Sequence, residues 1–246
     1  MFSAAFVMAL LSANAQKRAF TIEDLYRVKG VSSVSLSPDG KTVCYTASSS
    51  DLKNQKSGSD IYIMNADGSH TKALTEDGKS SSAVWSKDGK SIFFTNYEKG
   101  TAQIFRMDLT TCETEQVTDY ELGIGSPVIS PDERYIAFTA EVYPDLGADA
   151  KANKARMEKK EQGPVQAHIA DKLLYRHWTS YNDGRCNHLI LFDTQTKTYK
   201  DLTPGNYSLI FVVGGGITYQ FSPDSKEICF VSNHDEHQEA STNADL

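Results

Sequence analysis

The feature that most constrains the fold is a segment that recurs four times along the 246 residues. Each copy consists of a short apolar run, a turn of the pattern Ser-Pro/Lys-Asp-Gly/Glu/Ser, and a second apolar run. The turns begin at Ser37, Ser86, Ser130 and Ser222, at intervals of 49, 44 and 92 residues. Proline presets the φ of such a turn, and Asp and Gly tolerate turn conformations that β-branched residues resist. A repeat of this length indicates a modular fold built from similar units.

Each of the first three copies is followed by a second pair of apolar segments. These pairs are "SDIYIMNADGSHTKALT", "AQIFRMDLTTCETEQVT" and "NHLILFDTQTKTYKDLT". Alternating apolar residues around a turn rich in Asp, Gly or Thr predict a hairpin. Four antiparallel strands that repeat every ~40–50 residues are typical of a β-propeller blade. We therefore predict an all-β chain of about three and a half four-stranded blades, because the fourth copy shows only its first two strands.

The doubled interval before Ser222 predicts an insertion in the third blade, between its second and third strands and over residues of about 141–187. The first half, "GADAKANKARMEKKEQG", is rich in Ala, Lys and Glu and has Gly147 and Gly163 at its ends. These strong helix formers predict a short exposed helix. The second half, "LLYRHWTSYNDGRCNHLILFD", lies outside the repeat.

The N-terminus predicts a signal peptide over residues 1–15. Residues 2–13 are apolar and uncharged, and Ala13-Asn14-Ala15 gives a small-x-small cleavage site before Gln16. A buried N-terminal helix is the alternative. No window of 18 apolar residues occurs, so no membrane span is expected. The net charge of −7 argues against a nucleic-acid partner, which would favour a clustered basic surface.

No metal or cofactor is expected. The four cysteines are Cys44, Cys112, Cys186 and Cys229. They lack C-x-x-C spacing, so we expect all four to be structural, and those within apolar runs, Cys44 and Cys229, to act as small hydrophobic residues. His234 and His237 have no further ligand nearby, which favours a solvated loop over a metal site. No helix follows Gly214–Gly216, so a strand-entry turn is favoured over a phosphate site.

Several segments together resemble secreted serine peptidases of the prolyl oligopeptidase family. They are "FTIEDLYRVKGVSSVSLSPDGK", the repeated "SPDG"-type turns, "RHWTSYNDGRCNHL" and "SNHDEHQEASTNADL". The likeness is to members such as bacterial dipeptidyl-peptidase 5 and acylaminoacyl-peptidase. "SPDG" alone is also shared by TolB-type propellers, whereas the Arg-His-Trp pattern in this context is more specific.

The resemblance implies an N-terminal propeller that caps a C-terminal α/β-hydrolase domain bearing a Ser-Asp-His triad. Such a propeller admits short peptides and can contribute acidic residues that hold the N-terminus of a substrate. This chain has no Gly-x-Ser-x-Gly nucleophile elbow, and its nearest string, "GIGSP" at 123–127, lacks the spacing. We therefore expect residues 16–246 to be an incomplete propeller domain that contains no catalytic residue and hydrolyses nothing by itself.

The candidate substrate-binding residues are Arg176, His177, Trp178 and Glu141. The first three could line the central cavity and contact a peptide, and Glu141 could accept a hydrogen bond from a substrate ammonium. The alternative is that Trp178 and Tyr181 anchor the insertion on its blade, because an ordered insertion must bury something. Asn182-Asp183-Gly184 predicts a hairpin turn, so the stretch is interpreted first as a structural hairpin and second as a cavity wall.

Two functions are consistent with this pattern. The first is the substrate-gating propeller of an exported serine exopeptidase, periplasmic or secreted, whose partners are peptides and its own hydrolase domain. The second is a stand-alone periplasmic propeller of the TolB type that binds a protein and catalyses nothing. The insertion favours the first, because a plain propeller does not need it. A homodimer is an assembly that the sequence leaves open.

Overall fold

The computed structural model describes residues 18–170, 173, 175–209, 218–235, 237 and 240–246. The predicted signal peptide over residues 1–15 and the glycine run at 214–216 lie outside the described residues. Within the described ranges strands predominate, and the helices are α1 (Ile22–Arg27) and α2 (Ala150–Glu161). The all-β fold class is therefore confirmed.

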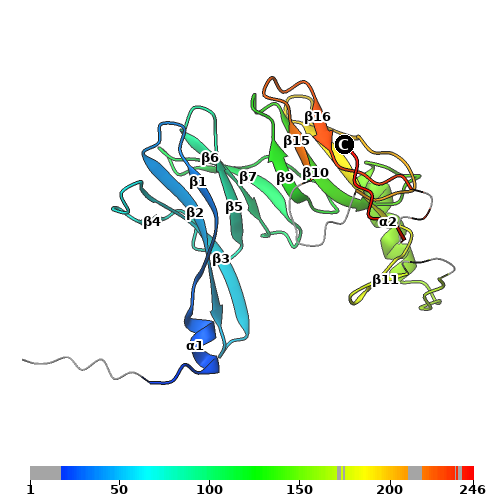
Figure 1. Cartoon of the computed structure of the whole chain (residues 1–246), viewed down its shortest axis with the longest axis horizontal. Coiled ribbons are helices and arrows are strands. Elements are labelled where there is room, and N and C mark those ends of the chain that lie inside the picture. The colour runs from blue at the N-terminus through cyan, green and yellow to red at the C-terminus, as the bar shows by residue number, and fades with distance from the viewer. Residues whose placement is uncertain (1–17, 171–172, 174, 210–217, 236, 238–239) are drawn as a thin grey trace, which may run out of the picture.

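Three antiparallel four-stranded sheets succeed one another along the chain (Figure 1). Blade 1 contains β1 (Gly30–Leu36), β2 (Thr42–Asp51), β3 (Lys56–Asn65) and β4 (Lys72–Ala73). Blade 2 contains β5 (Ser80–Trp85), β6 (Ser91–Asn96), β7 (Gln103–Asp108) and β8 (Thr114–Gln116). Blade 3 contains β9 (Gly125–Ile129), β10 (Tyr135–Val142), β13 (Cys186–Asp193) and β14 (Thr198–Asp201). In each sheet the strands lie side by side in chain order, which is the arrangement of a propeller blade.

A half blade comes after blade 3. Its strands β15 (Tyr219–Phe221) and β16 (Ile228–Phe230) pair antiparallel. One further antiparallel bridge joins Ser232 to Asp245. The described fold thus has about three and a half blades, as the repeat predicted.

The repeated turn is closed by the same hydrogen bonds in every blade. In blade 3, the Ser130 hydroxyl donates to Asp132 Oδ1 at 2.6 Å and accepts the Tyr135 N–H at 2.9 Å. Asp132 Oδ1 also accepts the Arg134 N–H at 3.1 Å. The turns at Ser37, Ser86 and Ser222 repeat this pattern. Because the side chains satisfy the backbone donors at the start of the second strand, the motif has a structural role.

The hydrophobic core lies between neighbouring blades. Cys44 of blade 1 belongs to a buried cluster with Ile92 of blade 2, and Ile104 of blade 2 belongs to one with Phe138 of blade 3. A third cluster joins blade 3 to β15 and β16 and includes Leu189. Blades 2 and 3 are therefore covered on both faces, which explains the apolar runs in their central strands β6, β10 and β13.

The burial of a cysteine likewise depends on whether a neighbouring blade covers its side chain. Cys44 is fully buried, and burial raises the pKa of its thiol to about 12, so it acts as a small hydrophobic residue as expected. Cys229 is exposed, which contradicts that expectation. It lies on β16 between Ile228 and Phe230, which pack toward blade 3, so its own side chain points to the uncovered face of the half blade.

The insertion spans residues 143–185 between β10 and β13 and is partly helical, as predicted. Asp149 caps α2 by accepting the Ala152 N–H at 3.0 Å. Asn153 is completely buried, accepts the Tyr143 N–H at 2.6 Å, and donates to the carbonyl of Gly147 at 3.0 Å. Its amide therefore fixes the base of the insertion to the end of β10.

Helix α1 was not expected from the sequence. Its signal is the Thr21-x-x-Asp24 spacing of a capping box, and the Thr21 N–H donates to Asp24 Oδ2 at 2.9 Å. Arg18 pairs with the same carboxylate and holds the pKa of Asp24 well below its usual range. Six residues are too few for a helical period to show in the sequence.

Candidate functional site

One face of the propeller carries both of its large additions. In an antiparallel blade the connections between the second and third strands all lie at the same end, which we call the 2–3 face. In blade 1 this hairpin is extended, since β2 and β3 have ten residues each against six for β6 and β7, and α1 packs beside β2. In blade 3 the 2–3 face carries the insertion. Figure 1 shows both additions projecting from the same side of the sheets.

Glu141 lies at this face, near the end of β10, and takes part in a small charged cluster. Its carboxylate is 3.0 Å from the Arg185 guanidinium. The Nε of Arg185 also donates to Asp183 Oδ2 at 2.9 Å. The Glu141 side chain is 63% exposed and that of Arg185 only 23%. Glu141 is therefore open to solvent on one side and held by a less exposed cation on the other.

Arg176, His177 and Trp178 lie on a separate two-stranded hairpin of the insertion. Its strands are β11 (Arg176–His177) and β12 (Ser180–Tyr181), and Arg176 pairs with Tyr181 in the ladder. The Arg176 side chain is exposed, and the His177 side chain lies outside what the structure describes. The Tyr181 ring stacks on His168, with centroids 4.1 Å apart, so the hairpin contacts another part of the insertion.

The anchoring role considered for Trp178 is wrong, because its side chain is 83% exposed. The insertion instead contacts the blades through Ala148 and Ala150, which pack against the blade 2–blade 3 cluster, and through the Lys154–Glu121 ion pair at 3.3 Å. The hydrogen bonds of Asn153 and the paired hydrogen bonds from Arg156 to Asp145, both at 2.7 Å, brace the insertion internally. The predicted turn at Asn182-Asp183-Gly184 does form, since the Gly184 N–H donates to Asn182 Oδ1. It comes after β12 rather than joining the hairpin strands, whose turn contains Trp178.

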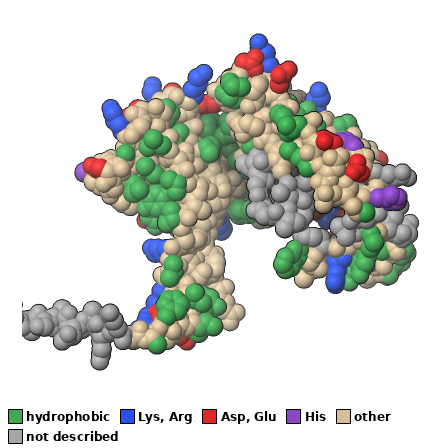
Figure 2. Space-filling model, viewed as in Figure 1, with side chains coloured by type: hydrophobic (Ala, Val, Ile, Leu, Met, Phe, Trp, Pro, Cys, Tyr) green, Lys and Arg blue, Asp and Glu red, His purple; other side chains and the backbone are tan. Residues whose placement is uncertain are grey.

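The four candidate residues therefore share one face but form two groups. Arg176, His177 and Trp178 belong to the outer hairpin, and Glu141 belongs to the Arg185 cluster at its base. Figure 2 shows apolar side chains gathered on both projections of this face. On the blade 1 side they include Phe20, Ile22 and Leu25, each at least 60% exposed. A polypeptide that passed between the projections would meet apolar surface at their ends.

A buried ion pair lies beneath the 2–3 face, and the sequence analysis did not predict it. His188 of β13 is fully buried, and its Nδ1 is 2.7 Å from Asp201 Oδ2 of β14. Its Nε2 is 2.9 Å from the carbonyl oxygen of Gly205. Burial alone would lower the pKa of this imidazole, but the hydrogen bonds to Asp201, Cys186 and Gly205 and the charge of Asp201 raise it to about 9. The repeat offers a signal, because His188 takes the place of Asp60 and Gln103 in the third strands of the other blades.

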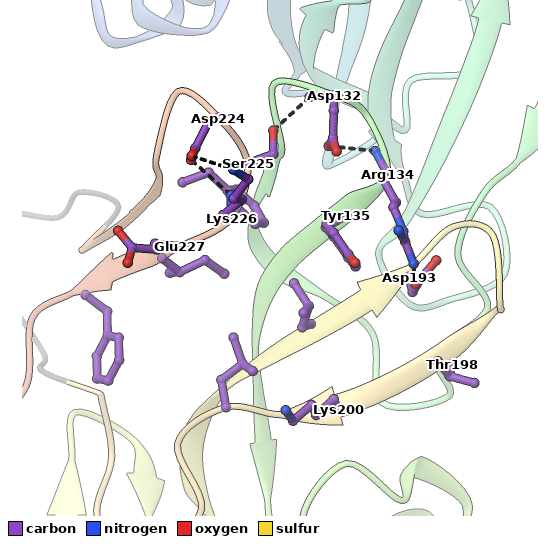
Figure 3. A pocket seen from close by; sticks show the side chains of 15 residues that line it. Asp132, Arg134, Tyr135, Asp193, Thr198, Lys200, Asp224, Ser225, Lys226 and Glu227 are labelled. Atoms are coloured by element: carbon purple, nitrogen blue, oxygen red, sulfur yellow. Dashed lines mark hydrogen bonds and ion pairs between the residues drawn. The ribbon is translucent and has the colours of Figure 1, made fainter.

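A groove lies between blade 3 and the half blade, away from the candidate residues (Figure 3). It encloses about 870 Å³. Its apolar wall includes Leu191, Leu202, Ile228 and Phe230, and charged side chains, among them the Arg134–Asp193 ion pair, stand at the turn end. Its position between two sheets favours a role in blade assembly over one in catalysis.

Among the residues that the structure describes, no three His, Cys, Asp or Glu side chains are placed to hold a metal ion. His234 lies 3.0 Å from the Ser232 hydroxyl and packs against Tyr207. In the described part of the chain, no helix is long and apolar enough to cross a bilayer.

Comparison with known proteins identifies relatives of this fold. The family model described as the TolB beta propeller domain matches residues 14–162. A dipeptidyl-peptidase 5 from Porphyromonas gingivalis is 30% identical over 207 residues, which cover 82% of this chain and 29% of that protein. The chain thus spans less than a third of the length of this curated relative.

Solved structures show the same architecture. An uncomplexed acylaminoacyl peptidase from Pyrococcus horikoshii superimposes with a TM-score of 0.59 at 18% identity, over 86% of this chain and 29% of that one. TolB from Acinetobacter baumannii superimposes with a TM-score of 0.50 at 20% identity, over 82% of this chain and 37% of that one. At these identities the likeness shows the fold alone.

Proposed function

Since this chain belongs to the TolB β-propeller domain family, we propose that it is the substrate-gating propeller of an exported serine exopeptidase of the dipeptidyl-peptidase or acylaminoacyl-peptidase type. The observation that carries the proposal is the insertion of residues 143–185 on the 2–3 face. A propeller that only binds a partner through its blades has no need of such an element. The similarity over 207 residues to a dipeptidyl-peptidase supports the choice of reaction.

The gating role rests on the position of the two projections. The extended β2–β3 hairpin with α1 and the insertion stand at opposite sides of the 2–3 face (Figure 1). A catalytic domain seated on this face would be flanked by both, and a peptide would have to pass between them. Exposed Trp178 and Arg176 would then be available to the chain of the substrate, through aromatic contact and hydrogen bonds to carbonyl groups.

Glu141 would select the free N-terminus of a peptide. Its carboxylate is already paired with the Arg185 guanidinium at 3.0 Å, and its own side chain remains largely exposed. A substrate ammonium would share this carboxylate with Arg185, forming a charge-assisted hydrogen bond. Because Arg185 also bonds to Asp183, the guanidinium keeps a partner when the substrate binds. A peptide with a blocked N-terminus would gain nothing from the pair.

The partners implied by the proposal are short peptides and an α/β-hydrolase domain that supplies the Ser-Asp-His triad. Its location would be periplasmic or secreted, on the basis of the signal peptide predicted at residues 1–15. The second candidate function is a TolB-like propeller that binds a protein and catalyses nothing. The family match and the superposition on TolB favour it as far as the blades are concerned. They do not account for the insertion.

The deciding experiment examines the gene and its full-length product. The reading frame is sequenced beyond the codon for Leu246, and the purified product is treated with a fluorophosphonate probe that labels activated serines. We expect an in-frame Gly-x-Ser-x-Gly motif, a labelled serine, and release of dipeptides from short substrates. A product that ends without a hydrolase domain and is not labelled would exclude the peptidase and leave the binding propeller.

Gating is tested separately in full-length protein that has not been treated with the probe. Residues 164–184 are replaced by a short Gly-Ser linker, which removes the β11–β12 hairpin but leaves α2 and Asn153 in place. If the hairpin gates access, longer peptides should be cleaved faster relative to dipeptide substrates. Asp67→Ser, in the turn before β4 at the opposite end of blade 1, serves as the control. An unchanged length preference in the deletion variant would mean that the insertion is only scaffold.

A further inference from the structure

One polar residue of the third strand holds the connection that leaves each complete blade toward the next one. In blade 1, Asp60 Oδ1 accepts the Gly78 N–H at 3.0 Å. In blade 2, Gln103 Nε2 donates to the Tyr120 carbonyl at 2.7 Å, and Gln103 Oε1 accepts the Tyr120 N–H at 3.1 Å. A carboxylate acceptor and an amide both keep their hydrogen-bonding roles as the pH rises above neutrality. The connections of blades 1 and 2 are therefore held in the same way at neutral and at alkaline pH.

Blade 3 has an imidazole at the same position. Residues 204–209 begin the connection that leaves this blade, and His188 Nε2 lies 2.9 Å from the carbonyl oxygen of Gly205. The Nδ1 of the ring lies 2.7 Å from Asp201 Oδ2. A carbonyl and an ionised carboxylate can only accept hydrogen bonds, so both ring nitrogens must donate for both contacts to form. Only the imidazolium form of the ring can do this.

The rest of this connection packs closely against blade 3. A Cβ added at Gly205 would lie 2.5 Å from the Tyr207 ring, so the ring packs directly over the glycine. The Asn187 N–H donates to the Ser208 hydroxyl at 3.0 Å, and the Leu209 N–H donates to the Asn187 carbonyl at 2.8 Å. Leu209 is 3% exposed and belongs to the cluster between blade 3 and the half blade. The contact of Gly205 with the imidazole therefore lies at the start of a segment whose other end is in the core.

Titratable groups face this ring and its carboxylate partner from several elements. They are Cys186 and Asp201 of blade 3, Tyr207 of the connection, His234 beyond the Tyr207 ring, and Tyr120 of blade 2, within reach of the Asp201 charge. Burial lowers the pKa of the imidazole, but the hydrogen bonds to Asp201 and Cys186 and the charge of Asp201 outweigh it and raise the pKa to about 9. The ring is therefore charged at neutral pH and loses a proton as the pH rises through 9.

When the ring loses one proton, its two contacts compete for the proton that remains. A hydrogen bond to a carboxylate is charge-assisted and stronger, so Nδ1 keeps its proton and Nε2 presents a lone pair to the carbonyl oxygen of Gly205. We propose that His188 is a pH-dependent latch: the imidazolium fastens residues 204–209 to blade 3, and loss of the Nε2 proton releases them at Gly205. The equivalent residues Asp60 and Gln103 give blades 1 and 2 no such switch. The latch is independent of the proposed peptidase function.

The test compares two backbone N–H groups that both donate to β13. Leu209 donates to the Asn187 carbonyl at 2.8 Å and Leu202 to the Leu189 carbonyl at 2.9 Å, but only Leu209 lies in the latched segment. Amide exchange of the purified chain is measured by quenched flow from about pH 7 to about pH 10. The ratio of the two exchange rates removes the pH dependence that they share. We expect the rate at Leu209 relative to Leu202 to rise about tenfold or more over this range.

Two variants and one titration separate the latch from general loosening. His188→Gln supplies an amide that donates to Gly205 at any pH, so its exchange ratio should stay constant. Asp201→Asn removes the charge that favours the imidazolium, so the rise in the ratio should move to lower pH by about one unit or more. Nitrogen-15 NMR of the wild-type imidazole should show a proton lost from Nε2 and kept on Nδ1, a measurement that also decides the matter if Asp201→Asn fails to fold. A constant ratio in the wild-type chain, an equal rise in His188→Gln, or a proton lost from Nδ1 instead would overturn the proposal.

Discussion

His188 Nδ1 lies 2.7 Å from Asp201 Oδ2, and this pair joins the third and fourth strands of blade 3 beneath the 2–3 face. The Nε2 of the same ring contacts the Gly205 carbonyl, which can only accept a hydrogen bond. With a carboxylate on one ring nitrogen and a carbonyl on the other, both nitrogens donate. The imidazole is therefore held as a cation, in a position that blades 1 and 2 fill with Asp60 and Gln103.

This pair predicts a loss of stability on the alkaline side of neutrality. The pKa of His188 in the folded chain, about 9, is higher than its ordinary value of about 6.5. Its contribution to stability is therefore complete below pH 6.5 and is lost as the pH rises through 9. We expect the free energy of unfolding to fall by up to about 3 kcal/mol over this interval, measured by urea unfolding at a series of pH values.

The control is His188→Gln, which places the residue of blade 2 at the equivalent position. Other groups titrate in the same interval, so the difference between the two pH profiles isolates His188. The variant should show a smaller fall between pH 6.5 and 9. Parallel profiles would mean that the imidazole is neutral throughout.

The serine of the repeated turn should contribute most to the stability of the fold in the blades where its side chain is buried. Ser130 is 2% exposed and makes two hydrogen bonds, so Ser130→Ala leaves the Tyr135 N–H without its acceptor. We expect a loss of about 1–3 kcal/mol in urea unfolding. Ser222 makes the same bonds in the more exposed half blade. Ser222→Ala should therefore cost less, and a larger loss there than at Ser130 would contradict this account.

Ser225 has an unfavourable backbone conformation, and a hydrogen bond between its side chain and the neighbouring blade offsets this cost. Its φ is +63°, and its hydroxyl accepts the Asp132 N–H at 3.0 Å, joining the turns of blade 3 and the half blade. Blades 1 and 2 have glycine at this position. Ser225→Ala and Ser225→Gly both remove the hydroxyl, but only glycine relieves the backbone. The Gly variant should be more stable than the Ala variant by about 1 kcal/mol in chemical unfolding. Equal stabilities would show that the backbone there is unstrained.

Trp178 and Phe138 are both large aromatic residues, but Trp178 is exposed and Phe138 is buried, so their effects on stability should differ. Trp178→Ala should change the free energy of unfolding by less than about 0.5 kcal/mol, because the indole is 83% exposed. Phe138→Ala should cost about 3–5 kcal/mol, because it removes a fully buried ring from the blade 2–blade 3 cluster. In the full-length protein, Trp178→Ala should still alter peptide turnover if the indole lines the substrate path. A large loss of stability in Trp178→Ala would restore the anchoring role.

Glu141→Gln, made in the full-length protein, tests the proposed selection of peptides with free N-termini. The variant should lower kcat/KM for peptides with a free ammonium and leave that for N-blocked peptides unchanged. Arg185→Gln is the matched partner change, since it removes the ion pair but keeps the carboxylate. If Glu141 binds substrate, Arg185→Gln should not reproduce the loss. Identical effects of the two variants on both peptide classes would show that only their ion pair matters.

Local sequence patterns were enough to predict the blades, because their strands and turns recur along the chain. The spacing of Ser37, Ser86, Ser130 and Ser222 fixed the number of units and located the insertion. Gly147 and Gly163 marked the helix within it, since helix propensity is a property of neighbouring residues. The short helix α1 had a capping-box signal in Thr21 and Asp24, but it is too short for a helical period of apolar residues to confirm that signal.

Which side chains are covered could not be predicted locally, because burial depends on what a neighbouring blade places opposite each strand. Trp178 is a large aromatic residue suited to anchoring the insertion, yet it is exposed, whereas the small Ala148 and Ala150 pack against the core. Cys44 and Cys229 lie in similar apolar runs, yet one faces a neighbouring blade and the other an open side. The pairing of His188 with Asp201 and of Glu141 with Arg185 likewise joins separate strands or segments, and such contacts are set by strand register and chain folding rather than by local sequence.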